Sequence, residues 1–154
     1  MSDKRINQLK FIASMFKISM DEFNNVMGPE SIQTIFRLIG ENQGTTIEKR
    51  LKEKYKVDSW TPEKLSELLI KDVFEPAIGE DGAEINVAGK ELTVKIKTCP
   101  FHKAGIKIDD KFYCTYTEGL IDTVSKLALK NTHFKTELLQ SDGKECCQFK
   151  IVII

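Results

Sequence analysis

The sequence predicts an α+β fold in which helices cover one face of an antiparallel sheet. Apolar residues follow helical spacing through about the first 75 residues, and then alternate at period two in two separate pairs of segments. One further helical segment lies between these two pairs. Because helices and hairpins are segregated along the chain, the sheet is expected to be antiparallel. We expect one domain over 1–154, with a mainly helical half (1–74) and an α/β core (75–154).

The helical half begins with an apolar stripe that predicts a helix over 4–16, and Asp21 is a candidate cap for a short helix that Gly28 and Pro29 end. A long helical pattern follows from Ile32 to Tyr55. Gly40 and Gly44 either break it into two helices or form a small-residue face where another element packs closely. Thr61 and Pro62 are typical of a helix start, which leads into a helix with a leucine-rich face.

The second half contains the strands. Residues 85–87 and 92–96 alternate across the turn at 88–90, which predicts a hairpin. Residues 118–130 return to helical spacing. Strands are then expected over 134–139 and 146–153, joined by Asp142-Gly143, a dipeptide typical of hairpin turns.

Composition excludes several classes of function. The 154 residues carry 23 basic and 23 acidic side chains, so a basic surplus for direct nucleic-acid binding is lacking. No apolar run approaches the ~20 residues of a membrane helix, and the first residues lack the pattern of a signal peptide. We therefore expect a soluble cytoplasmic protein, whose thiols stay reduced.

All four cysteines lie in the last 56 residues. Cys99 and His102 form a Cys-x-x-His step where a strand is expected to end, and Cys114 precedes the helix expected from 118. Three cysteines and one histidine make a closed tetrahedral set for structural zinc. Adjacent strand residues point to opposite faces, so only one of Cys146 and Cys147 can easily join, and Cys147 is preferred.

Two other interpretations of these residues stay open. The cysteines can be ordinary buried apolar groups, with His102 exposed. Cys99 and His102 can also form a catalytic thiolate–imidazolium pair, although no Gly-x-Gly-x-x-Gly fingerprint and no third group orienting the histidine are found. An enzyme is the less favoured class.

The C-terminal half carries a resemblance. Residues 112–121, Phe-Tyr-Cys-Thr-Tyr-Thr-Glu-Gly-Leu-Ile, and residues 142–151, Asp-Gly-Lys-Glu-Cys-Cys-Gln-Phe-Lys-Ile, are similar to motifs of the 4-vinyl-reductase-type (4VR) small-molecule and hydrocarbon-binding domain. The resemblance covers about 85–153, and the helical half looks like that of small stand-alone archaeal members. It implies a fold shared with haem-nitric-oxide-binding domains and TRAPP vesicle-tethering subunits.

The resemblance also implies a function and a ligand set. Such domains bind apolar or aromatic molecules between helices and sheet, often as homodimers, and several serve as sensors. Zinc-bearing members use cysteines that match Cys114 and Cys147. Their other two ligand positions fall near Thr136 and Leu139, which cannot replace them, so Cys99 and His102 complete the expected set.

The expected function is therefore a ligand-binding or sensing module with a structural zinc at Cys99, His102, Cys114 and Cys147. A dimeric protein-interaction subunit is the alternative, and Gly40 and Gly44 are candidates for its interface. The ligand pocket has candidates in Phe36, Tyr116 and Ile121, each of which ordinary core packing also explains.

Overall fold

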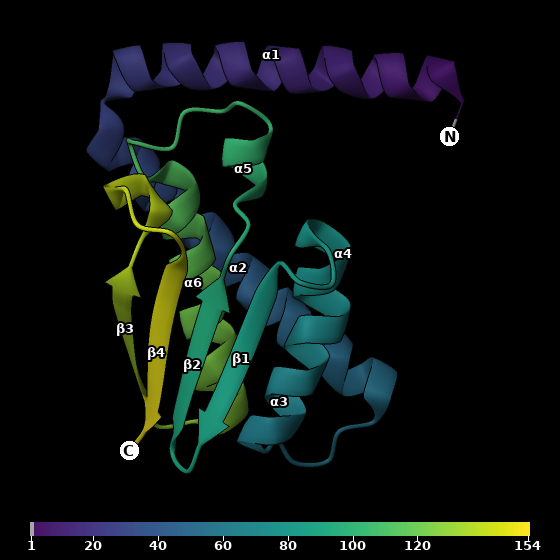
Figure 1. The fold of residues 1–154 in the computed structure, drawn as a ribbon, viewed down its shortest axis with the longest axis vertical. Coiled ribbons are helices and arrows are strands. Elements are labelled where there is room, and N and C mark those ends of the chain that lie inside the picture. Colours follow the sequence, from purple (N-terminus) through teal and green to yellow (C-terminus); the bar gives the residue numbers. More distant parts are fainter. Residues whose placement is uncertain (1) are drawn as a thin grey trace.

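In a computed structural model, which describes residues 2–154, four strands form one antiparallel sheet. The strands are β1 (Ala83–Ala88), β2 (Glu91–Ile96), β3 (Thr132–Leu138) and β4 (Cys147–Ile153). Their spatial order is β1-β2-β4-β3, and every neighbouring pair is antiparallel (Figure 1). Each of the two expected hairpins is present, and β2 and β4 join them along the centre of the sheet. The predicted α+β class is confirmed.

Helices cover one face of this sheet. They include α2 (Pro29–Tyr55), α3 (Pro62–Leu69) and α6 (Phe112–Leu129), with α6 lying directly behind the strands in Figure 1. Alternate residues of β2 and β4 are fully buried, among them Leu92 and Phe149, while their neighbours along the strand are half-exposed. This period of two places the main core between the sheet and the helices.

The helix boundaries correct the sequence prediction at two places. α1 (Asp3–Met27) is one continuous helix, not a helix over 4–16 and a second short one, because neither Gly nor Pro interrupts it before Gly28. α6 begins at Phe112, six residues before the expected start. Phe112 and Tyr113 are buried on its inner face, so the helical packing begins there. Cys114 consequently lies within the first turn of α6.

Short elements connect the main ones. Thr61 caps α3 as predicted, since its hydroxyl accepts a hydrogen bond from the backbone N–H of Lys64 (3.2 Å). A π-helical turn (Ile70–Phe74) continues α3 into α4 (Glu75–Ile78). α5 (Pro100–Lys103) follows β2, and a 3₁₀ turn (Gln140–Asp142) follows β3. No helix among residues 2–154 combines the length and apolar content that crossing a bilayer requires.

α2 and α6 cross at very short distance because three glycines leave room for the opposite backbone. A Cβ atom added at Gly40 would overlap the carbonyl oxygen of Tyr116, and one at Gly44 would stand 2.7 Å from the carbonyl oxygen of Leu120. A Cβ atom at Gly119 would meet the Arg37 carbonyl oxygen at 2.5 Å. Gly40 and Gly44 are therefore a close-packing face within one unbroken helix.

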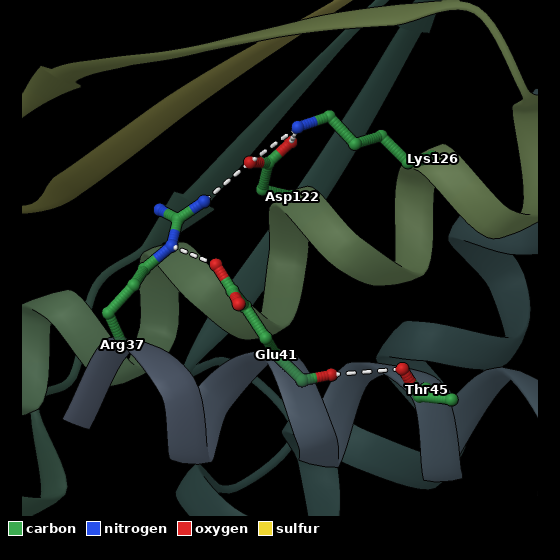
Figure 2. A network of polar contacts seen from close by, with 5 residues as sticks. All are labelled: Arg37, Glu41, Thr45, Asp122 and Lys126. Carbon is green, nitrogen blue, oxygen red and sulfur yellow. Dashed lines mark hydrogen bonds and ion pairs between the residues drawn. The ribbon is translucent and has the colours of Figure 1, made fainter. Parts of the chain in front are cut away.

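Ion pairs fix the two helices beside this crossing (Figure 2). The buried carboxylate of Asp122 on α6 accepts from Arg37 Nη2 on α2 (2.5 Å) and is also paired with Lys126 Nζ (3.0 Å). Arg37 Nε in turn donates to Glu41 Oε1 one turn along α2 (3.0 Å). A charge-assisted pair of this kind is geometrically demanding, so it holds α2 and α6 in one rotational setting.

We predict that Gly40→Ala destabilises the fold although alanine favours helices. The added methyl has to push α6 away, and overpacking of this kind typically costs about 1–3 kcal/mol. Urea denaturation measures the change in unfolding free energy. Asn42→Ala, at an exposed position of the same helix, is the control and should change stability by less than about 0.5 kcal/mol. An unchanged or more stable Gly40→Ala variant would show that α2 and α6 do not depend on this close approach.

Candidate functional site

An apolar cavity of about 280 Å³ lies between the helices and the sheet. Every element that meets at the top of the core contributes to its wall: α2, the π-helical turn, α4, β2, the segment around α5, α6 and β4. No charged residue is among the wall residues, which are Ile47, Val73, Phe74, Ala77, Ile78, Ile96, Cys99, Pro100, Phe101, Ile108, Tyr113, Cys114, Tyr116, Thr117, Leu120, Cys147 and Phe149. The volume is close to the lower end of the ~300–1,000 Å³ of small-molecule pockets.

Two groups of residues form the flanks of the cavity. The π-helical turn and α4, which continue α3, place Val73, Phe74 and Ile78 on one flank. On the opposite flank, the ring of Phe101 stacks on that of Tyr113, with 3.8 Å between centroids. Tyr113 also meets Phe36 edge to face at 5.4 Å, which anchors this aromatic pair to α2.

Three of the four cysteines line this one cavity. Cys99 comes from the N-cap of α5, Cys114 from the first turn of α6 and Cys147 from the start of β4. Cys146 is absent from the wall, so Cys147, the residue of this adjacent pair that the sequence analysis prefers, is the one that lines the cavity. Three of the four residues predicted to bind a metal thus line one cavity, and their assignment to zinc stays a prediction.

Hydrogen bonds hold each of the three sulfurs in a different way. The Cys114 thiol donates to Ser141 Oγ (3.3 Å), while the Cys147 sulfur accepts from the backbone N–H of Gln140 (3.3 Å). The Cys99 sulfur accepts from the backbone N–H of His102 (3.5 Å) as the cap of α5. Desolvation raises the pKa of Cys114, and it raises the pKa of Cys147 to about 11. Both groups are therefore neutral thiols at physiological pH.

His102 is the predicted site residue that the structure does not bring into the cavity. It is exposed and lines a separate surface hollow with Lys107, Gln140 and Ser141. Among residues 2–154, no group of three or more His, Cys, Asp or Glu side chains is arranged so that it could hold a metal ion. Its hydrogen bond with Cys99 involves the backbone N–H, not the ring, so this contact does not form the catalytic pair considered from sequence.

Of the residues expected to line a pocket, Tyr116 does so, whereas Phe36 and Ile121 do not border the cavity. Ile121 is completely buried in the core, and Phe36 packs behind the wall against Phe112 and Tyr113. Sequence reasoning missed Phe101, Tyr113 and the π-helical turn. Tyr113 lies in the 112–121 motif and Phe101 lies between Cys99 and His102, but only the tertiary fold shows that their rings stack.

These features define the class: an α+β domain with an apolar cavity between its helices and its sheet. The chain shares the fold of trafficking protein particle complex subunit 3 from Naegleria fowleri, whose crystal structure holds covalently bound palmitic acid. The two structures agree with a TM-score of 0.64 over 97% of this chain and 96% of the other, at 14% sequence identity.

No protein-family model matches the sequence, and no curated protein matches it either. At 14% identity, the structural likeness establishes the fold and confirms the expected TRAPP-subunit-like architecture. Membership of the 4-vinyl-reductase-type family stays a prediction.

The raised pKa of Cys147 predicts how stability depends on pH. In the folded chain this thiol ionises at about pH 11, and in the unfolded chain near pH 9. Between these two pH values the unfolded state therefore binds fewer protons than the folded state. The contribution of the Cys147 thiol to the unfolding free energy is complete below about pH 9 and is lost as pH rises to about 11. Urea denaturation across this range should show falling unfolding free energy, with a smaller fall in Cys147→Ser. Equal slopes in the two proteins would contradict the assignment.

Proposed function

We propose that this chain binds a long apolar molecule of the fatty-acyl type in the cavity between its helices and sheet. The observation that carries this proposal is the wall itself, which is mainly apolar and free of charged residues. A charged head group has no partner inside, so it is expected to remain outside while the hydrocarbon part enters. The chain would thus serve as a cytoplasmic binding or sensing module.

The energetics favour such an occupant. Each methylene removed from water contributes about 0.8 kcal/mol, so ten buried methylenes supply roughly 8 kcal/mol before the entropy cost of binding. The similar trafficking subunit holds palmitic acid, which supports an acyl chain as the ligand class.

The first test is native mass spectrometry of freshly purified protein, followed by titration with a fluorescent fatty acid. We expect retained apolar molecules and saturable binding. Ala77 is an exposed residue of the cavity wall, so the ring added by Ala77→Phe should obstruct the cavity there and weaken binding at least tenfold. Ala88→Phe, at an exposed position outside the wall, is the matched control. Absence of both retained ligand and saturable binding would refute the proposed function.

A covalent form of this binding is the second candidate. Three thiols line the cavity, and the likeness to a protein that carries palmitic acid covalently makes thioester formation chemically reasonable. The Cys99 sulfur would attack the carbonyl carbon of an acyl thioester donor. A new carbon–sulfur bond forms, the donor's own carbon–sulfur bond breaks, and the donor thiol takes the proton. We favour Cys99 because Cys147 is buried and burial raises the pKa of both other thiols.

Incubation with an acyl thioester tests this step. An acyl mass that hydroxylamine removes should appear on the wild type and on Cys146→Ser, because Cys146 lies outside the wall. The same mass should be lost in Cys99→Ser. Acylation that survives Cys99→Ser and disappears in Cys114→Ser would move the attachment to α6. Acylation of Cys146 alone would show that the cavity does not direct the reaction.

Structural zinc stays a separate proposal. Cys99, Cys114 and Cys147 already face one space, and bound zinc would need the ring of His102 to turn away from its surface hollow toward them. The native spectrum that reports the apolar ligand would also report one zinc ion per chain. A chain that retains the apolar ligand but carries no zinc would support the binding proposal and refute the zinc proposal.

We also propose that the chain works as a homodimer. This proposal combines the alternative function, a dimeric protein-interaction subunit, with ligand binding. The supporting observation is α1, which lies apart from the rest of the molecule and is joined to it mainly through its last turns (Figure 1). Every residue from Ser2 to Ile18 is exposed. A helix in this state has few contacts of its own to stabilise it.

A further inference from the structure

We propose that two copies of the chain assemble by exchanging their N-terminal helices, the arm of each lying on the elbow of the other. The arm is residues 3–18 of α1. The elbow is residues 19–42, which comprise the end of α1, Gly28 and the first half of α2. This inference rests on the proposed homodimer and specifies its interface.

The arm and the elbow carry almost all of the exposed apolar surface. Within residues 2–154, seven exposed large apolar side chains belong to the arm and six to the elbow, while Leu127 and Ile154 lie elsewhere. Phe11 on the arm is 70% exposed and Val26 on the elbow 81%. Apolar positions occupy more than half of the circumference of α1, a pattern typical of a helix that is covered on several sides.

The amount of this surface fits a dimer. Taking roughly 150 Å² for a large apolar side chain, thirteen such groups at about half exposure leave on the order of 1,000 Å² uncovered. The largest apolar patch of a typical monomer is about 300–600 Å², and a standard interface covers about 800 Å² on each partner. The arm and elbow together therefore provide the area that one further copy would bury.

Charge identifies the partner as a second copy. The arm carries four basic residues and one acidic residue, a net charge of +3, whereas the elbow carries four acidic residues and one basic residue, a net charge of −3. Arg37 and Glu41 of the elbow are already paired within the chain. Lys10 and Lys17 on the arm and Asp21 and Glu22 on the elbow take part in no ion pair among the described residues.

The geometry requires this exchange to be between molecules. α1 is one straight helix, and an arm of 16 residues at 1.5 Å per residue extends roughly 24 Å away from its own elbow (Figure 1). The arm cannot fold back onto the elbow of the same chain without breaking the helix. In a two-fold symmetric pair, each basic arm meets one acidic elbow, and both apolar surfaces are covered at the same time.

Charge-reversal variants of the arm and of the elbow test this arrangement. Sedimentation equilibrium should find the wild type dimeric at micromolar concentration. Lys10→Glu with Lys17→Glu makes an acidic arm, and Asp21→Lys with Glu22→Lys makes a basic elbow. Each double variant alone should dimerise at least tenfold more weakly, and an equimolar mixture should recover the wild-type affinity as a heterodimer. Lys49→Glu with Lys52→Glu, at exposed positions farther along α2, is the matched control and should remain dimeric.

The other results are equally informative. All substituted positions are exposed, so circular dichroism should show every variant folded. A wild-type dimer that neither double variant weakens would refute the arm exchange and leave the homodimer standing. A monomeric wild type would refute both, and a monomer that binds anionic phospholipid vesicles through the arm would assign this surface to a membrane instead.

Discussion

The close crossing of α2 and α6 is the constraint on which the rest of the structure depends. Gly40 and Gly44 leave no side chain between α2 and the backbone of α6, and Gly119 does the same in the opposite direction. This approach sets how far α6 stands from the sheet, because α2 supports it from behind. Tyr116 and Leu120, whose carbonyl groups touch the two α2 glycines, also belong to the cavity wall. Packing at the crossing therefore decides the shape of the cavity.

Much of the fold follows from local sequence patterns. Period-two alternation located both hairpins, and Thr61-Pro62 marked the start of α3 correctly. The patterns failed where tertiary contacts decide the boundary. Nothing in the local sequence requires α6 to begin at Phe112; the helix starts there because Phe112 and Tyr113 are covered by α1, α2 and the α5 segment. Residue-level periodicity does not contain this information.

The site, too, could be predicted only in part, because its composition also depends on tertiary contacts. The cysteine positions indicated that distant segments converge, and Cys99, Cys114 and Cys147 do line one space. The chemistry of that space depends on what lies between the sulfurs. In residues 2–154 this space is an apolar volume flanked by stacked rings, and a zinc ion held by its thiols stays a prediction. A cysteine pattern alone cannot distinguish these two cases, because thiols suit an apolar wall as well as a metal.

The cavity and the elbow are connected through a second, smaller core. Met20 near the end of α1 packs with Ile32 of α2 and Phe112 of α6, and Phe36 lies against the same cluster. Phe36 also contacts Tyr113, whose ring stacks on Phe101 at the cavity. A continuous series of packed aromatic groups thus runs from the elbow to the cavity wall. Because closely packed interiors do not deform continuously, displacement of Phe101 by an entering chain would be transmitted toward the elbow. The proposed ligand binding and the proposed assembly would therefore depend on one shared set of contacts.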